Sequence, residues 1–455
     1  MSLDLYKKVK QELEEVSPSF CLAKWKQVTV HLQTGHTHSC HHPQIHKIPL
    51  SELENNPSAL HNTNEKKIAR KKMLEGVRPS ECDYCWKIED SNPESFSDRI
   101  TKSSDNWSYP YFQEVEKAPW DSNINPSYFE VSFGNECNFK CAYCHPQISS
   151  AIMNELVKLG PSKLNPGLTV ESMKENNVFP YGKDEENPYV TAFWTWWPRL
   201  KETLDVFRIT GGEPLLNPNT FSFLDSLIDE PMPNLNLAIN SNLGITDYHF
   251  NLFLEKIKKI VSEKKVKSFQ LFTSVDTFGK NAEFVRFGLN YEQYMKNVRK
   301  FLETVPEVDL VFMSTYNALS VINYDKLLVD ILDLKKSFPK GNWTRVFLDT
   351  PYLKDPQYLS CYILDKSFLK YMQRDLEFMQ RQNLENGLFS EFEIAKFKRI
   401  LDWVDSLEET DHRNGHRKNF AFFVKEYEQR KNIKFNDYCP EYKLFLEKCL
   451  KLFMI

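Results

Sequence analysis

The middle of the chain alternates short β-rich runs with longer amphipathic stretches. Runs of apolar and β-branched residues predict six strands, at 128–134, 206–210, 235–240, 268–274, 308–315 and 344–349. Apolar residues at helical spacing predict the helices between them, at 147–159, 219–229, 246–263, 291–304 and 323–336. Strands that alternate with helices predict an α/β fold with a parallel sheet, either open or partly closed into a barrel.

The flanking regions have different patterns. Residues 25–32 alternate like a strand, and Gly35 fits the turn of a hairpin that follows it. The last hundred residues predict amphipathic helices at 368–384 and 390–407, a polar linker at 408–418, and a segment at 420–427 that packs back on the core. Three parts are therefore expected, with boundaries at 1–115, 120–355 (including an insertion at about 155–200) and 356–455.

Two local patterns in these regions have specific interpretations. Ser390, with Glu393 three residues later, fits a capping box at the start of the second C-terminal helix. The aromatic patch at 193–197 lies in the insertion, where core packing is favoured over a lid beside the substrate.

Composition narrows the functional classes. The 455 residues include 58 Lys+Arg and 62 Asp+Glu, a near-balance that argues against a general nucleic-acid binder. The apolar runs are too short to cross a membrane, and the charged first residues do not resemble a secretory signal, so a cytoplasmic protein is expected. Ten cysteines in a reducing compartment favour metal binding or catalysis over disulfides.

One group of cysteines forms a C-x3-C-x2-C triplet. Cys137, Cys141 and Cys144 lie just past the strand predicted at 128–134, at the strand end where βα folds place catalytic groups. Three thiolates do not complete the four-ligand set of structural zinc, whereas a [4Fe–4S] cluster held by three cysteines has one open iron. His145 could supply a fourth zinc ligand, although the spacing is unusual for zinc.

The triplet, with Tyr143 before its last cysteine, resembles the radical S-adenosylmethionine (radical SAM) enzymes. Gly211-Gly212-Glu213-Pro214, directly after the strand at 206–210, is similar to the family motif that holds the methionyl amino group. The resemblance implies a partial (β/α)6 barrel. It also implies a [4Fe–4S] cluster on the triplet, with S-adenosylmethionine bound at its open iron.

Four further residues at predicted strand ends or downstream of them are candidate contacts for S-adenosylmethionine. Ser274 and Asp276 suit ribose hydroxyls, Asn240 closes the third strand, and the resemblance implies that Arg286 meets the cofactor carboxylate. Each residue also has an ordinary structural interpretation, as a helix cap, a turn residue or a surface ion-pair partner.

The remaining grouped cysteines are Cys21, Cys40, Cys82 and Cys85. Their C-x13-G-x4-C and C-x2-C spacing is similar to the first part of the SPASM or twitch auxiliary-cluster domains, although here it precedes the barrel. The resemblance implies a second, closed [4Fe–4S] cluster, with zinc as the alternative. The histidines around Cys40 are interpreted as loop residues or outer donors, and Cys361, Cys439 and Cys449 as small hydrophobic residues.

The resemblance implies reductive cleavage of S-adenosylmethionine to a 5′-deoxyadenosyl radical that abstracts hydrogen from a substrate. The expected outcome is oxidation or modification of a peptide, a protein or a small molecule, as in oxidoreductases or maturases. The expected partners are that substrate and an electron donor such as flavodoxin or ferredoxin. The competing hypothesis is a non-catalytic, zinc-binding interaction protein.

Overall fold

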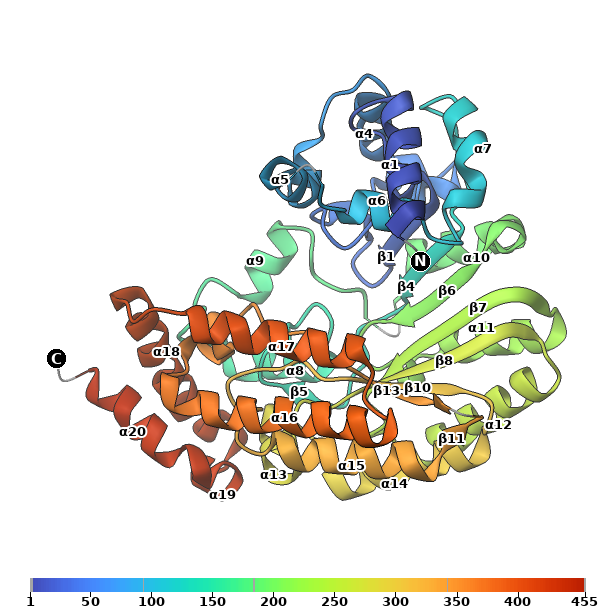
Figure 1. The fold of residues 1–455 in the computed structure, drawn as a ribbon. Helices are drawn as coiled ribbons and strands as arrows, with labels where there is room; N and C mark the ends of the chain where they lie inside the picture. Colours follow the sequence, from blue (N-terminus) through green and yellow to red (C-terminus); the bar gives the residue numbers. More distant parts are fainter. Residues whose placement is uncertain (1–2, 93, 183–184, 342, 454–455) are drawn as a thin grey trace.

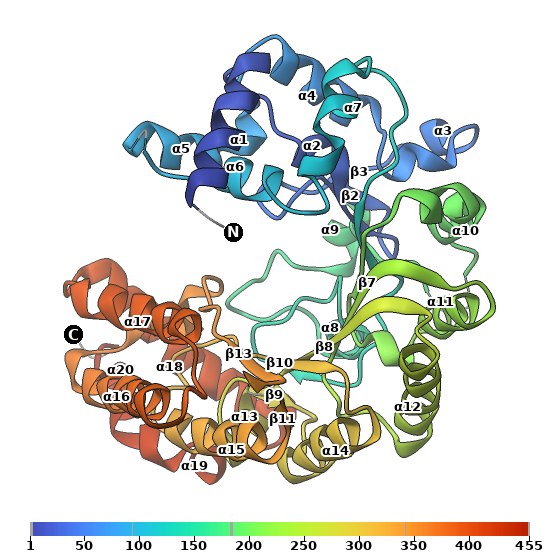
Figure 2. The ribbon, with the colours of Figure 1, turned by 45° about the vertical axis from the view of Figure 1, so that its right-hand side comes forward.

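A curved, mostly parallel sheet forms the centre of the computed structural model, which describes residues 3–92, 94–182, 185–341 and 343–453. The strand order is β13-β10-β8-β7-β6-β4-β1-β2-β3, and Figures 1 and 2 show how the sheet curves around a central space. The six strands predicted for the core are present and parallel: β4 (Tyr128–Ser132), β6 (Val206–Thr210), β7 (Met232–Ser241), β8 (Val266–Ser274), β10 (Asp309–Met313) and β13 (Val346–Asp349).

Helices cover the outer, convex face of this sheet. The predicted helices are found as α8 (Ser150–Leu159), α11 (Pro218–Asp229), α12 (Asp247–Ser262), α14 (Tyr291–Thr304) and α15 (Tyr324–Ser337). Along β6 the apolar Phe207 and Ile209 are buried, whereas Arg208 and Thr210 alternate with them and are only half-buried. Because successive strand residues point to opposite faces, the concave face is left partly polar.

The N-terminal hairpin continues the sheet of the core. β1 (Gln27–His31) pairs in parallel with β4, and β2 (His36–His38) folds back antiparallel to β1, as the sequence pattern predicts. β3 (His46–Lys47) completes this edge. Helices around the hairpin enclose a small second apolar core: α1 (Leu3–Val16), α2 (Ala23–Lys26), α4 (Asn64–Leu74), α5 (Asp83–Ser91), α6 (Asp98–Ser103) and α7 (Phe112–Lys117). The short helix α3 (Leu50–Leu53) packs on the main core through Leu53.

The insertion after α8 contains α9 (Val170–Glu175) and α10 (Pro188–Leu200). Phe193 and Trp196 of α10 are buried against Phe129 of β4, so the aromatic patch packs in the core. Tyr189 of the same helix lies against Gly35, where an added Cβ would approach the tyrosine ring to 2.1 Å. With a φ of 63° as well, position 35 requires glycine, and the insertion is packed against the hairpin.

The C-terminal region is helical and lies beyond β13, as Figure 2 shows. Its helices are α16 (Leu369–Asn386), α17 (Glu391–Ser406), α18 (Asp411–Lys431), α19 (Phe435–Tyr438) and α20 (Lys443–Lys451). The Ser390–Glu393 capping box is present. Short elements complete the fold: β5 (Lys140–Cys141), β9 (Arg286–Phe287), β11 (Pro339–Lys340), β12 (Trp343–Thr344) and α13 (Gly279–Val285).

The polar linker predicted at 408–418 is wrong. Thr410 caps α18, and the helix runs through this segment. Arg413 and Arg417 turn inward and donate hydrogen bonds to the carbonyls of Tyr362 (2.6 Å) and Ile363 (2.7 Å). A charged sequence predicts side chains exposed to solvent, but these two arginines instead donate hydrogen bonds to backbone carbonyl groups of the protein. Among the described helices, none has the length and apolar character needed to span a bilayer.

Candidate active site

The cysteine triplet opens onto a cavity of about 200 Å³ at the carboxyl ends of the core strands. The cavity wall combines the loop after β4 with the ends of β6, β7 and β8. It contains these residues singled out from the sequence: Cys137, Tyr143, Cys141, Cys144, Gly211, Gly212, Asn240, Ser274 and Arg286. The fold therefore brings together candidates from five separate segments, namely the loop after β4, the ends of β6, β7 and β8, and β9 with Arg286.

The start of α8 holds the cysteine loop. The Ser150 hydroxyl accepts a hydrogen bond from the backbone N–H of Cys137 at 3.0 Å. Ser149, the N-cap residue of α8, donates from its hydroxyl to the Phe139 carbonyl, also at 3.0 Å. Two consecutive serines thus fix the loop that presents the triplet.

A short strand pair places an arginine beside the triplet. Cys141 of β5 is paired with Arg286 of β9, and Arg286 Nη1 lies 4.0 Å from Cys141 Sγ. Arg286 also donates to Asp276 from Nε (3.0 Å) and Nη2 (2.9 Å), and from Nη2 to the Tyr143 hydroxyl (2.7 Å). The triplet is therefore bordered by a fixed positive charge.

Burial raises the pKa of the triplet thiols. It raises the pKa of Cys144 to about 11 and that of Cys141 further, although the Arg286 charge lowers the pKa of both. A metal or cluster must therefore displace protons when it binds, because thiolate is the ligand form.

Asp276 lies behind the cavity wall. Its side chain is fully buried, and its carboxylate accepts hydrogen bonds from Arg286, from the Tyr143 hydroxyl (2.9 Å) and from the Thr315 N–H (3.1 Å). These contacts hold Arg286 and Tyr143 in place. The ribose contact expected for Asp276 stays a prediction, and Ser274 is the residue of this pair that reaches the cavity.

The glycine pair lets two loops pack together. A Cβ on Gly212 would lie 2.3 Å from the Glu136 carbonyl oxygen, and Gly211 has a φ of 123°. Glu213 N–H donates to the same carbonyl at 2.6 Å. The loop after β6 is thereby joined to the cysteine loop after β4, so the glycines are needed for this backbone contact.

The Glu213 side chain points into the protein. Its carboxylate accepts hydrogen bonds from the Ser241 hydroxyl (2.8 Å) and from the N–H groups of Asn242 (2.6 Å) and Leu215 (3.1 Å). Burial raises the pKa of Glu213 to about 7 against the effect of these bonds. Glu213 thus fixes the end of β7, and its expected contact with the methionyl ammonium stays a prediction.

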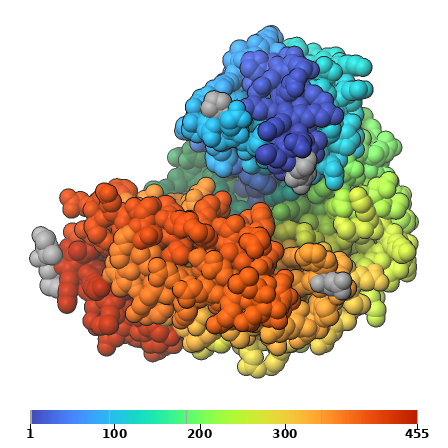
Figure 3. All heavy atoms as spheres, in the orientation of Figure 1, coloured from blue at the N-terminus to red at the C-terminus, as the bar shows by residue number. Residues whose placement is uncertain are grey.

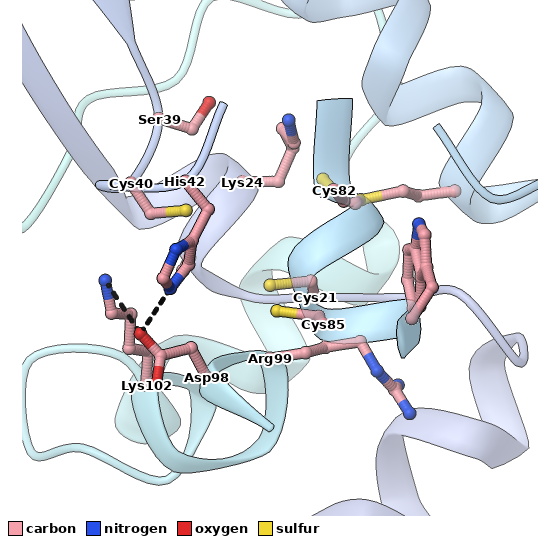
Figure 4. A pocket seen from close by; sticks show the side chains of 13 residues that line it. Cys21, Lys24, Ser39, Cys40, His42, Cys82, Cys85, Asp98, Arg99 and Lys102 are labelled. Carbon is pink, nitrogen blue, oxygen red and sulfur yellow. Dashed lines mark hydrogen bonds and ion pairs between the residues drawn. The ribbon is translucent and has the colours of Figure 1, made fainter. Parts of the chain in front are cut away.

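The four N-terminal cysteines line a second cavity. Figure 4 shows that the sulfur atoms of Cys21, Cys40, Cys82 and Cys85 all point into one common space, whose volume is about 20 Å³. Burial raises the pKa of Cys82 and Cys85 to about 12. Three cations that sequence reasoning missed also line it: Lys24, Arg99 and Lys102.

Neither cysteine group has the side-chain arrangement of a single-ion site. Within the described ranges, no three His, Cys, Asp or Glu side chains form a group that could hold one metal ion. Tetrahedral zinc with Zn–S bonds of about 2.3 Å would draw its sulfurs to about 4 Å from one another. The thiols instead surround cavities. Three or four cysteines can hold an iron–sulfur cluster, and four cysteines are also a donor set for structural zinc.

The neighbouring histidines have other partners. His42 Nε2 lies 2.8 Å from Asp98 Oδ2, and the ring of His42 stacks on Tyr84. His38 hydrogen-bonds to the Cys40 carbonyl. His145 lies in a separate cavity of about 300 Å³, between the cysteine loop and α18. The loop interpretation is wrong for three of these histidines, because His36 and His38 lie on β2 and His46 on β3, whereas His42 lines the four-cysteine cavity. The three remaining cysteines are buried: Cys361, Cys439 and Cys449.

The C-terminal helix α18 braces the cysteine loop, which no motif in the sequence indicates. The Tyr427 hydroxyl reaches the carbonyls of Lys140 (3.3 Å) and Phe284 (3.0 Å), one on each side of the β5–β9 pair. Arg430 donates to the carbonyls of Gly160 (3.1 Å) and Pro161 (2.6 Å), just after α8. The site therefore depends on contacts between residues nearly three hundred positions apart.

Comparison with known proteins gives limited but specific similarities. No protein-family model matches the chain. It is 26% identical over 219 residues to the GTP 3′,8-cyclase of Campylobacter jejuni subsp. doylei, covering 48% of this chain and 54% of that protein. It is 26% identical over 212 residues to the same enzyme of Campylobacter jejuni subsp. jejuni serotype O:6, covering 46% and 52%.

These cyclases are radical SAM enzymes. The similarity supports the radical SAM family. The chain spans about half the length of the curated relatives it matches, so the comparison bears on the general radical SAM reaction and leaves the substrate open. A radical SAM core is also consistent with the mixed α/β fold and its central, mostly parallel sheet.

Proposed function

We propose that the protein is a radical SAM enzyme with two iron–sulfur clusters that modifies or oxidises a peptide, a protein or a small molecule. The observation that carries this proposal is the cavity at the strand ends. It joins a three-cysteine loop to Gly211, Gly212, Asn240, Ser274 and Arg286. Three cysteines leave one iron of a cluster without a protein ligand, and the adjoining space is where a cofactor would reach it.

The residues of the chain have distinct tasks in this proposal. Cys137, Cys141 and Cys144 would hold the [4Fe–4S] cluster, and the cavity would hold S-adenosylmethionine. When bound, these groups supply a 5′-deoxyadenosyl radical that abstracts a hydrogen atom. Arg286, fixed by Asp276, contributes a positive charge for the cofactor carboxylate, and the Gly211–Gly212 backbone forms the opposite wall.

The N-terminal site would hold an auxiliary [4Fe–4S] cluster of the twitch type. Its support is the convergence of Cys21, Cys40, Cys82 and Cys85 on one space. A cluster with four protein ligands has no open iron, so electron transfer suits it better than substrate ligation. An oxidised product would require an electron acceptor, which is the role we assign to this site.

An external reductant completes the proposed reaction. We expect a small one-electron donor such as flavodoxin or ferredoxin, and a reducing cytoplasm that keeps the seven cluster thiols available. The oxidoreductase or maturase assignment rests on this scheme.

The test is anaerobic reconstitution with iron and sulfide, followed by reduction with dithionite in the presence of S-adenosylmethionine. The expected result is a brown protein that forms 5′-deoxyadenosine. Cys361→Ala serves as the matched control, because Cys361 is buried in the core away from both cavities. A colourless protein that holds zinc and forms no 5′-deoxyadenosine would instead support the zinc-binding interaction protein.

A further inference from the structure

Arg286 lies against one of the three thiols that would hold the cluster of the triplet. Its Nη1 is 4.0 Å from Cys141 Sγ, and the strands β5 and β9 pair these two residues directly. The Ala142 N–H donates to the Val285 carbonyl at 2.7 Å, so the neighbouring residues of the two strands are joined as well. The backbone of both strands therefore keeps the arginine beside this sulfur.

The remaining contacts of Arg286 fix the orientation of its guanidinium. Nε and Nη2 donate to the two carboxylate oxygens of Asp276 at 3.0 and 2.9 Å, and Nη2 also donates to the Tyr143 hydroxyl at 2.7 Å. Three of the five N–H groups are used in this way. The other two belong to Nη1, which is the nitrogen beside Cys141.

The ion pair and the sulfur lie where water has little access. The side chain of Arg286 is 9% exposed and that of Asp276 is 0% exposed. Figure 3 shows that the C-terminal helices, in orange and red, form one side of the molecular surface. From these helices, Tyr427 of α18 reaches the carbonyls on both sides of the β5–β9 pair. Charges interact more strongly where water is excluded, so the guanidinium acts on Cys141 with little screening.

Asp276 opposes the charge of Arg286 without cancelling it at the sulfur. Its carboxylate binds the edge of the guanidinium formed by Nε and Nη2, whereas Nη1 faces Cys141. Burial raises the pKa of Cys141, and the Arg286 charge lowers this pKa more strongly than the Asp276 charge raises it. The thiol position therefore experiences a net positive contribution from the pair.

We propose that Arg286 raises the reduction potential of the cluster held by the triplet, so that a one-electron donor can reduce it. This role rests on the proposed function for the identity of the cluster, and it is separate from a contact with the cofactor carboxylate. In the step concerned, one electron passes from the donor to the site, and no bond forms or breaks. Because that electron adds a negative charge beside Cys141, the guanidinium stabilises the reduced state. Net charge and hydrogen bonds to sulfur are what set the potentials of iron–sulfur clusters.

The test is a redox titration of the full chain, reconstituted anaerobically and followed by electron paramagnetic resonance. Every protein carries Cys82→Ala, so that the triplet cluster is the one followed. S-adenosylmethionine is omitted, so that its carboxylate has no influence. Arg286→Gln should favour the oxidised state about tenfold, which lowers the midpoint potential by about 59 mV for one electron. Asp276→Asn should raise the potential, because it removes a charge of the opposite sign.

Three further variants separate this effect from damage to the protein. Arg286→Lys keeps the charge and should keep the potential of the parent Cys82→Ala protein. The double variant Arg286→Gln/Asp276→Asn leaves no unpaired charge in the buried site, and its potential should lie between those of the parent and Arg286→Gln. Arg299→Gln, taken from an exposed ion pair with Asp333, should leave the potential unchanged.

The proposed role of Arg286 is overturned if Arg286→Gln and the double variant titrate like the parent. It is also overturned if Arg286→Gln and Asp276→Asn shift the potential in the same direction. Formation of 5′-deoxyadenosine by the parent is measured on the same preparations after S-adenosylmethionine is added. A parent with no reducible cluster and no 5′-deoxyadenosine would contradict the proposed function, whereas an active parent with unchanged potentials in the variants would contradict the role of Arg286 alone.

Discussion

The two cysteine sites differ in how their ligands are assembled and in what surrounds them. The triplet comes from one loop, and it adjoins about 200 Å³ of space with walls from three further strand ends. The N-terminal site gathers four cysteines from three segments around about 20 Å³. A site with space and an incomplete donor set can take a reactant, whereas the small space enclosed by four thiols leaves no comparable room for one.

Their surroundings differ as well. The triplet is bordered by Arg286, whose charge is largely matched by Asp276. Around the four-cysteine site, three cations are each paired with a carboxylate: Lys24 with Glu81, Arg99 with Glu89 and Lys102 with Asp98. The difference is one of number, because one paired cation borders the triplet and three paired cations line the four-cysteine cavity.

The largest expected effect separates the two sites by function. Cys141→Ala should abolish 5′-deoxyadenosine formation, because the triplet then loses a ligand. Cys82→Ala should still cleave S-adenosylmethionine, but it should form no product. Its iron content should fall by about half. Iron analysis and a 5′-deoxyadenosine assay check both variants. The division of roles would be wrong if Cys82→Ala turned over normally or if both variants lost cleavage alike.

The next effect concerns the charge beside the triplet. Asp276→Asn would leave the buried Arg286 without its partner, at a cost of about 3–5 kcal/mol in the free energy of unfolding. It should also weaken binding of S-adenosylmethionine. Asp225→Asn, in an exposed pair with Lys256, is the matched control and should change little. Equal denaturation midpoints for the two variants would contradict this account of Arg286.

The glycine contact between the loops after β4 and β6 gives a smaller effect. Gly212→Ala should cost about 1–3 kcal/mol, because its Cβ would collide with the Glu136 carbonyl. Gly415→Ala in α18 has open space around it and should stabilise the protein by about 0.5–1 kcal/mol. Chemical denaturation measures the free energy of unfolding of the two variants and of the wild type. The steric explanation fails if Gly212→Ala is as stable as the wild type.

Because the N-terminal thiols are buried, we expect the stability of the metal-free protein to depend on pH. Burial raises the pKa of Cys82 and Cys85 from 9.0 to about 12, so the folded state binds these protons more tightly than the unfolded state. Their contribution to stability is complete below pH 9.0 and is lost as the pH rises towards 12. Thermal melting across this window should show a steeper loss in the wild type than in a Cys82→Ala/Cys85→Ala variant. Parallel curves would contradict the expected linkage.

The smallest effect tests the brace on the cysteine loop. Tyr427→Phe removes a hydroxyl from the carbonyls of Lys140 and Phe284, and should cost about 0.5–1.5 kcal/mol. Tyr248→Phe, on an exposed side chain, is the control and should be neutral. If the two variants melted at the same temperature, α18 would not stabilise the loop through this bond.

The sequence predicts an element correctly where the residues that determine it are close together in the chain. The six core strands follow from their apolar runs, and the capping box from two residues three positions apart. The linker predicted at 408–418 is wrong because the sequence of this segment does not show that Arg413 and Arg417 reach the carbonyls of Tyr362 and Ile363. Such partners are set by tertiary packing.

The same distinction applies to the site. The cysteines and the glycine pair are recognisable because their spacing is local. The β5–β9 pairing that brings Arg286 to Cys141, and the contacts of Tyr427 with Lys140 and Phe284, join segments far apart in the chain. No local signal marks them, and only the fold shows that Asp276 lies behind the wall that Ser274 forms.

The most direct test of the division between the two sites is electron paramagnetic resonance of the dithionite-reduced protein, with and without S-adenosylmethionine. The account predicts two overlapping cluster signals, of which only the one lost in Cys141→Ala changes when the cofactor is added. The signal that remains in Cys141→Ala should be insensitive to the cofactor and should disappear in Cys82→Ala. A cofactor-sensitive signal that survives in Cys141→Ala, or a single signal that both variants lose, would contradict the account.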